Sequence, residues 1–115
     1  MQVTCTPDSE LDGATVVTPA GRLDAMGATQ LWDAAAPFVT EAAPSLLVDM
    51  SKVDIMSSAG ISTLIRFLTH VKQLGGKLSV YGCNGGVRKV FKIVGLEPLL
   101  NVCDTAEEAR ARVKA

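Results

Sequence analysis

Two neighbouring serines, Ser57 and Ser58, are the residues in this sequence best placed for a chemical modification. They are followed by Ala59-Gly60 and an amphipathic segment, so they lie where a helix is expected to begin. The first turn of a helix carries backbone N–H groups without helical partners and the positive end of the helix dipole, which together accommodate a phosphate. The same serines also fit an ordinary N-cap, which stabilises a helix by about 1 kcal/mol, and the local pattern alone favours that simpler interpretation.

Other groups of residues that could carry chemistry are weak in this sequence. His70 is the only histidine, and it falls late on an expected helix, on a face predicted to be solvated. Residues 82–86 follow a strand, but they match neither G-x-G-x-x-G nor the P-loop, so a structural turn is the simpler interpretation. Cys5, Cys83 and Cys103 form no CxxC pair and are expected to be reduced structural thiols. We therefore expect no catalytic residue, no metal site and no cofactor, and an enzyme or nucleotide-binding domain is the least favoured alternative.

Length, composition and charge set the class of protein. The 115 residues, 48% hydrophobic and 20% charged, suffice for a core, so residues 1–115 are expected to form a single domain. A formal net charge of -1 without a cluster of Lys or Arg argues against nucleic acid as a partner. The apolar runs fall well short of the roughly 20 residues that span a membrane, and the first residues do not resemble a signal peptide. A cytoplasmic protein with no membrane partner is expected.

Hydrophobic periodicity predicts the elements that would position the serines. Alternation in residues 3–6 and 14–18 predicts an antiparallel hairpin closed by an Asp-Gly turn. An apolar run at 45–50 predicts a buried central strand, followed by a loop at 49–61 that leads to the helix bearing the serines. That helix is expected over 58–74, with a core-facing stripe formed by Ile61, Leu64, Ile65 and Leu68.

After the hairpin, strands and helices alternate along the chain. This order predicts an α/β fold in which the N-terminal antiparallel hairpin leads into a mostly parallel sheet of about five strands packed with about four helices. The other expected elements are a helix with Asp24 as its N-cap, a strand at 77–81, a helix at 87–94, a strand at 99–102 and a helix near Asp104 with Thr105 and Glu108 at capping-box spacing.

Three charged residues come at the ends of expected strands. Arg22 and Asp24 follow the second strand, and Asp49 follows the third. Because open α/β sheets gather function at the carboxyl ends of neighbouring strands, we expect these residues to flank Ser58. Asp24 fits equally well as the N-cap of the first helix, and both roles are compatible.

Three motifs in order along the chain carry a family resemblance. They are Gly21-Arg22-Leu23-Asp24-Ala25, then Val48-Asp49-Met50-Ser51 with residues 53–61, then Val87-Arg88-Lys89-Val90-Phe91 with Gly95-Leu96. With these motifs, the sequence resembles the anti-sigma factor antagonists of the STAS domain family over nearly its whole length. The resemblance implies the STAS, or SpoIIAA-like, fold.

The resemblance also implies a binding module that is switched by phosphorylation. In such proteins the unphosphorylated domain binds an anti-sigma factor that is itself a serine kinase of the histidine-kinase-like ATPase fold, and this frees a sigma factor or related regulator. Phosphorylation of the serine at the helix start releases the kinase, and a metal-dependent serine phosphatase removes the phosphate. Alignment on the family motif places the acceptor at Ser58, with Ser57, where the family often has an acidic residue, as the alternative. ATP and magnesium belong to the kinase.

A partner-binding surface around this serine follows from the same resemblance, with Met26 and Met56 expected to supply exposed apolar area. A second hypothesis is a STAS accessory subunit of a lipid or anion transport complex, in which the same helix docks on a partner without being phosphorylated. The predicted partner-binding residues are Arg22, Asp24, Met26, Asp49, Met56, Ser57, Ser58, Ala59, Gly60 and Ser62.

Overall fold

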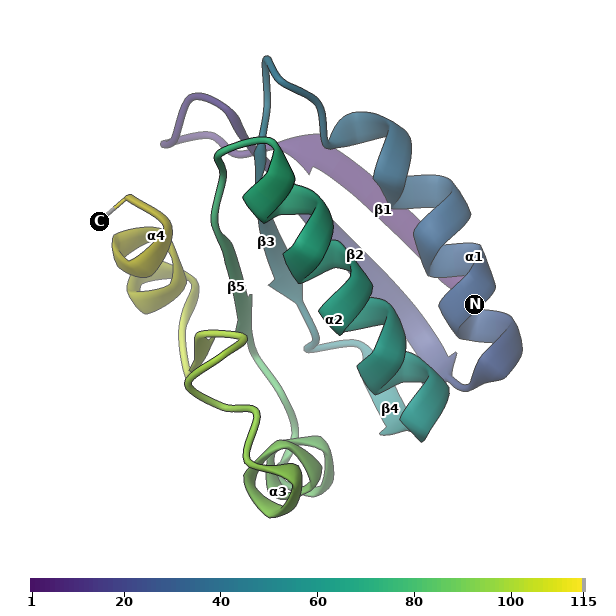
Figure 1. The fold of residues 1–115 in the computed structure, drawn as a ribbon. Coiled ribbons are helices and arrows are strands. Elements are labelled where there is room, and N and C mark those ends of the chain that lie inside the picture. The colour runs from purple at the N-terminus through teal and green to yellow at the C-terminus, as the bar shows by residue number, and fades with distance from the viewer. Residues whose placement is uncertain (115) are drawn as a thin grey trace.

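A computed structural model describes residues 1–114 and shows a six-stranded sheet in the order β1-β2-β3-β5-β6, with β4 paired to β2 (Figure 1). Strand β1 is antiparallel to β2, and the other pairings among these residues are parallel, which confirms the predicted fold class. The elements are β1 (Gln2–Pro7), β2 (Ala14–Leu23), α1 (Ala25–Ala35), the 3-10 turn η1 (Ala36–Phe38), β3 (Ser45–Asp49), β4 (Val53–Met56), α2 (Ser58–Gln73), β5 (Leu78–Tyr81), α3 (Gly85–Val94), β6 (Val102–Cys103) and α4 (Ala106–Lys114).

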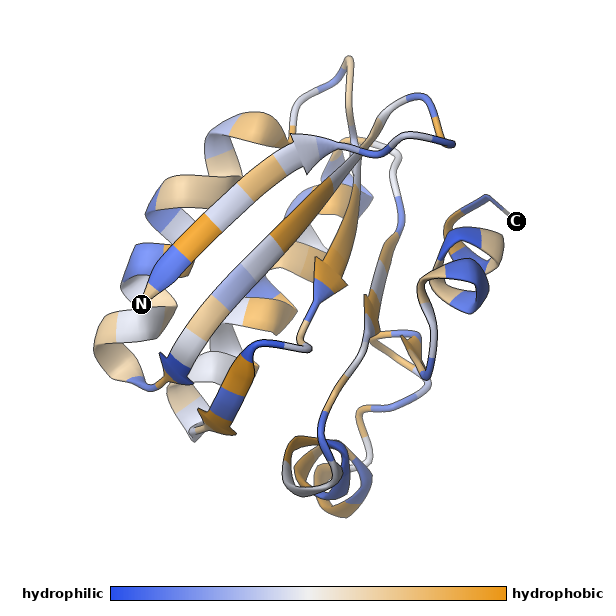
Figure 2. Ribbon diagram, turned by 180° about the vertical axis from the view of Figure 1, so that it is seen from behind, coloured by the Kyte–Doolittle hydropathy of each residue, from blue (hydrophilic) through white to orange (hydrophobic). Residues whose placement is uncertain are grey.

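Helices cover the sheet in two separate layers. Helices α1 and α2 lie against one face of the sheet, and in the view from behind the strands β1, β2 and β3 stand in front of them (Figure 2). The alternation along β3 divides the core, because Val48 belongs to the cluster beneath α1 and α2 whereas Leu47 packs with Ala109 and Val113 of α4. The α4 helix therefore covers the opposite face of the sheet.

The buried stripe of α2 differs from the predicted one. Leu64, Phe67, Leu68 and Val71 are buried, at the i, i+3, i+4 and i+7 spacing of one helix face. Ile65, predicted to face the core, is 37% exposed, because the buried stripe is rotated about a sixth of a turn around the helix axis from the predicted one.

Strand β4 occupies residues that the sequence pattern assigned to a loop. Its Ile55 and Met56 pair in parallel with Arg22 and Leu23 at the end of β2. The ten-residue β2 thus pairs first with β3 through residues 14–17 and then with β4. As a result, the ends of β2 and β4 meet at one edge of the sheet, and the two helices that follow them begin side by side.

The C-terminal third also differs in detail from expectation. The helix predicted at 87–94 begins earlier, at Gly85, because Asn84 serves as its N-cap, and it ends at Gly95 in the left-handed conformation. The strand predicted at 99–102 is shorter and later, since β6 holds only Val102 and Cys103 and follows Asn101, whose φ is +49°. A positive φ interrupts extended backbone, so this strand cannot begin sooner.

Candidate functional site

The starts of α1 and α2 are pressed against the end of β2, and a glycine in each helix permits this approach. A Cβ atom on Gly27 would lie 2.3 Å from the Arg22 carbonyl oxygen. A Cβ atom on Gly60 would lie 2.8 Å from Leu23 Cγ and 2.9 Å from the Leu23 carbonyl oxygen. Both distances are shorter than van der Waals contact, so any larger residue would push the helix start away from the sheet.

The two serines at the start of α2 have different surroundings. The Ser57 backbone N–H and its hydroxyl both donate to the Leu23 carbonyl oxygen, at 3.0 and 3.2 Å, and the residue is half-buried. Ser58, the first residue of α2, is exposed, and within residues 1–114 its side chain makes no hydrogen bond. Of the pair, Ser58 therefore presents the freely accessible hydroxyl.

The start of α2 also differs from the starts of the other helices. The Gly27 N–H donates to Asp24 Oδ1 (2.9 Å) at α1, the Val87 N–H to Asn84 Oδ1 (2.8 Å) at α3, and the Glu108 N–H to Thr105 Oγ1 (3.2 Å) at α4. At α2, no side chain among the described residues caps the helix, because the Ser57 hydroxyl is turned to β2. The first turn of α2 thus keeps N–H groups that are free to bind an anion.

Most of the predicted partner-binding residues do gather around Ser58. Asp24 is confirmed as the N-cap of α1, and Arg22 is exposed at the neighbouring end of β2. Met26 is 72% exposed in the first turn of α1 and offers the apolar area expected of it. Met56 does not, because it is only 8% exposed and its side chain packs beside Gly60 beneath α2. Met56 and Gly60 therefore support the helix start from below.

Asp49 lies away from the serines, contrary to the expectation that it would flank them. It alternates with Val48, which faces α1 and α2, so its side chain points to the opposite face of the sheet. There its Oδ1 accepts a hydrogen bond from the Ser51 N–H at 3.0 Å. Burial, reinforced by the nearby Asp49 charge, raises the pKa of Tyr81 on this same side.

Two surface features near Ser58 were missed by the sequence pattern. One is Ile55, which is 58% exposed on β4; recognition of that strand would have placed its side chain outward. The other is a shallow groove of about 400 Å³ between α1 and α2, and its far end holds the Arg66 guanidinium 3.8 Å from the centre of the Trp32 ring. The groove is lined by Ala25, Ala28, Thr29, Trp32, Asp33, Ala59, Ser62, Thr63 and Arg66.

His70 and Cys83, the remaining side chains that could react, are packed against other parts of the fold. His70 Nε2 lies 3.1 Å from the Val39 carbonyl oxygen and its ring meets Trp32 edge-on, so it packs between helices and is not on a solvated face. Burial raises the pKa of Cys83 to about 11, which keeps this thiol protonated at neutral pH. Within residues 1–114, no group of His, Cys, Asp or Glu is arranged to hold a metal ion, and no helix is long and apolar enough to cross a membrane.

Comparison with known proteins identifies the family. The family model of the STAS domain matches residues 8–109. The chain belongs to the STAS domain family. Among named relatives of this STAS domain, BtrV of Bordetella bronchiseptica, a candidate anti-sigma factor antagonist, is 27% identical over 105 residues, which span 91% of this chain and 90% of BtrV.

Solved structures share the fold of this STAS domain. An anti-sigma factor antagonist from Mycobacterium paratuberculosis aligns with a TM-score of 0.81 at 24% identity, over 99% of this chain and 96% of its own. The anti-sigma factor antagonist SpoIIAA in its unphosphorylated form aligns with a TM-score of 0.77 at 22% identity, over 96% of each chain. SpoIIAA of Bacillus in its phosphorylated form aligns with a TM-score of 0.69 at 21% identity, over 96% of this chain and 99% of that one.

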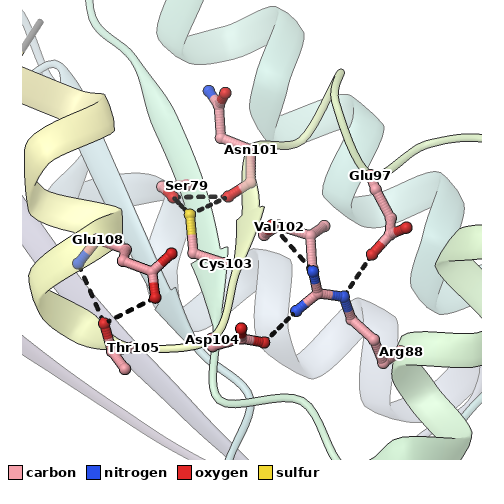
Figure 3. A network of polar contacts seen from close by, with 9 residues as sticks. All are labelled: Ser79, Arg88, Glu97, Asn101, Val102, Cys103, Asp104, Thr105 and Glu108. Carbon is pink, nitrogen blue, oxygen red and sulfur yellow. Dashed lines mark hydrogen bonds and ion pairs between the residues drawn. The ribbon is translucent and has the colours of Figure 1, made fainter.

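In this STAS domain, a network of hydrogen bonds and ion pairs connects α3 to the segment that precedes α4 (Figure 3). The Arg88 guanidinium donates to Glu97 and to Asp104 Oδ1, the latter at 2.8 Å, and also reaches the Val102 carbonyl oxygen. Next to it, the Ser79 hydroxyl donates to the Asn101 carbonyl oxygen at 2.7 Å. The network fixes one side of α3 to the body of the domain.

Proposed function

We propose that this STAS domain is an anti-sigma factor antagonist of the partner-switching type, with Ser58 as its phosphorylation site. The unphosphorylated domain binds an anti-sigma factor serine kinase of the histidine-kinase-like ATPase fold through the surface around Ser58. This binding frees a sigma factor or related regulator, and phosphorylation of Ser58 releases the kinase. The switch operates in the cytoplasm, where a metal-dependent serine phosphatase restores the binding form. The domain itself performs no catalysis.

The observation that carries this proposal is the different engagement of the two serines. The Ser58 hydroxyl is exposed and unbonded within residues 1–114, whereas the Ser57 hydroxyl is half-buried and donates to the Leu23 carbonyl oxygen. A kinase reaches the first without disturbing the fold, but it has to break a hydrogen bond to reach the second. Ser58 is therefore the first acceptor and Ser57 the alternative.

Charge explains why phosphorylation would act on binding more than on folding. A phosphoserine adds about -1.5 to -2 charges and three strong acceptor oxygens at a point that was neutral and small. The uncapped first turn of α2 can receive these oxygens with its free N–H groups, so the fold tolerates them. A partner surface that is complementary to a bare hydroxyl is repelled by the same charge, even where apolar contacts such as Met26 remain.

The experiment that tests the proposal is phosphorylation in vitro followed by site mapping. The domain is incubated with ATP, magnesium and each serine kinase of this ATPase fold from the same genome, and the products are measured by intact mass and peptide mapping. We expect one phosphate on the wild type and on Ser57→Ala, and none on Ser58→Ala. Phosphate on Ser58→Ala at the wild-type rate would assign the switch to Ser57. A wild type that no kinase modifies, yet that binds a transport ATPase, would support the accessory-subunit hypothesis instead.

A further inference from the structure

Asn84 connects two elements through all the polar atoms of its side chain. Its Nδ2 donates to the Val53 carbonyl oxygen at 3.1 Å and to the Asp54 carbonyl oxygen at 3.2 Å, both on β4. Its Oδ1 accepts from the Val87 N–H at 2.8 Å and so caps α3. One side chain thus joins the start of α3 to the strand that runs directly into Ser58.

Strand β4 has few other hydrogen-bonding partners on the edge that faces α3. Among the described strands it pairs with β2 alone, and its opposite edge faces α3 across a small groove. In Figure 1, α3 lies at the same end of the molecule as β4 and the start of α2. Arg88 anchors α3 to Glu97 and Asp104 on the other side (Figure 3), so Asn84 supplies the polar anchor toward β4.

Exposed apolar side chains lie on both of the elements that Asn84 joins. Ile55 on β4 is 58% exposed, and Ile93 on α3 is 74% exposed. The groove between these elements is lined by Ile55 together with Val87 and Val90. Because Ile55 lies three residues before Ser58 in the chain, the β4 side of this groove is close to the serine.

We propose that Asn84 is a positioning residue of the partner-binding surface, which holds α3 and β4 together as one rigid support beside Ser58. This inference rests on the proposed function. Without the two hydrogen bonds to β4, only the apolar packing of Val87 and Phe91 holds α3 against the core, and the partner has to fix its position on binding. The cost reduces the affinity of the kinase for this domain, so its KM rises while kcat stays nearly unchanged.

Two kinds of variant separate positioning from general stability. In Asn84→Ser the hydroxyl can still cap α3 but is too short to reach the carbonyl oxygens of β4. Asn84→Asp and Asn101→Asp form a matched pair. Each variant replaces an amide that donates a hydrogen bond by a carboxylate, so both add the same charge, but only Asn84→Asp affects the contact with β4. Asn101 Nδ2 donates to the Leu78 carbonyl oxygen at 2.9 Å, at the start of β5, and Asp tolerates the left-handed conformation found there.

Phosphorylation kinetics with the kinase and ATP are the functional readout. We expect KM for Asn84→Ser and Asn84→Asp to rise about fivefold to tenfold, the size expected for two lost hydrogen bonds, with kcat within about twofold. Asn101→Asp should keep the wild-type KM, even if its melting temperature falls by as much as that of the Asn84 variants. A wild-type KM in Asn84→Ser, or an equal rise in Asn101→Asp, would overturn the proposal.

Amide hydrogen exchange without any kinase tests the anchor independently of the proposed function. We expect faster exchange in β4 and α3 of Asn84→Ser than in the wild type, with α1 and the core of α2 unchanged. Unchanged exchange in β4 and α3 refutes the anchor itself. If no kinase modifies the wild type, the proposed function fails, and the exchange pattern still decides whether Asn84 holds α3 to β4.

Discussion

The starts of α1 and α2 lie side by side at the ends of β2 and β4, yet only one of them is capped by a side chain. We call the capped start closed and the uncapped start open. Asp24 caps α1 by accepting from the Gly27 N–H, whereas Ser57 turns its hydroxyl to the Leu23 carbonyl oxygen and leaves α2 uncapped. The same edge of the sheet therefore carries one closed helix start and one open helix start. The open one bears Ser58, and the N–H groups of its first turn have no side-chain acceptor among residues 1–114.

Among the variants, one that places a charge at the open helix start should have the strongest effect. Ser58→Asp should weaken binding of the anti-sigma factor kinase by roughly a hundredfold, because like charges or unpaired charges in an interface cost several kcal/mol. Ser58→Ala should bind as the wild type does. Thr69→Asp is the matched control, since Thr69 is also exposed on α2 but lies about three helical turns later, outside the predicted partner-binding residues. Titration calorimetry measures all three, and equal affinities for Ser58→Asp and Thr69→Asp would contradict a switch centred on Ser58.

The close approach of both helix starts to β2 predicts the next effect. Gly27→Ala and Gly60→Ala should each lower the free energy of unfolding by about 1–3 kcal/mol, as overpacking of a well-packed site does. The effect should be larger for Gly27, where a Cβ meets backbone at 2.3 Å. Gly85→Ala is the control, because a Cβ there meets nothing within 4 Å and alanine favours the helix. Urea unfolding gives the values, and destabilisation by Gly85→Ala equal to the others would refute the packing argument.

Removing each helix-start side chain tests the difference between the closed and open ends directly. Asp24→Ala should destabilise the domain by about 1 kcal/mol, since it leaves the Gly27 N–H without its cap. Ser57→Ala should cost less than about 0.5 kcal/mol, because the Leu23 carbonyl oxygen keeps its hydrogen bond from the Ser57 N–H. Thermal or urea unfolding measures both variants. A larger loss in Ser57→Ala would show that Ser57 stabilises α2 as a true cap.

The last effect is absent at neutral pH, and it sets the pH range in which these comparisons hold. The pKa of Cys83 is raised by burial from 9.0 to about 11, so the folded state retains a proton that the unfolded chain loses. Stability is therefore independent of this group below pH 9 and declines between about pH 9 and pH 11. Cys83→Ala should flatten the decline, although Cys5 and Tyr81, whose pKa values are also raised by burial, contribute to it. Urea unfolding at stepped pH values checks this, and an unchanged slope in Cys83→Ala would contradict it.

Elements with many periodic residues were predicted well from the sequence. The hairpin, α1 with its cap Asp24, and the length of α2 follow from local patterns that several residues share. Strand β4 was missed because its four residues are too few to establish a period, and its partner is the end of β2, about thirty residues earlier. The face of α2 was misplaced at Ile65 because the large Phe67, which was not counted in the stripe, turns the helix toward the core.

The features of the candidate site also fall into those predicted from the sequence and those set by contacts between distant segments. The cap Asp24 was predicted from its position before a helix and the exposed Met26 through the family resemblance, whereas the burial of Met56 and the outward turn of Asp49 depend on which face of the sheet each residue occupies. Facing follows from strand register, and register is set by pairing between distant segments. Ser58 as the phosphorylated residue remains a prediction from the family motif.

Local sequence patterns were enough to predict two serines at the start of an amphipathic helix and an acidic cap on the neighbouring helix. Which serine hydroxyl is free depends on contacts between distant parts of the chain. The Ser57 hydroxyl is bound to the Leu23 carbonyl oxygen, 34 residues away in the chain, and this bond exists because β4 pairs with the end of β2. Since hydrogen bonds between distant residues leave no local pattern, the open start of α2 is a property of the fold.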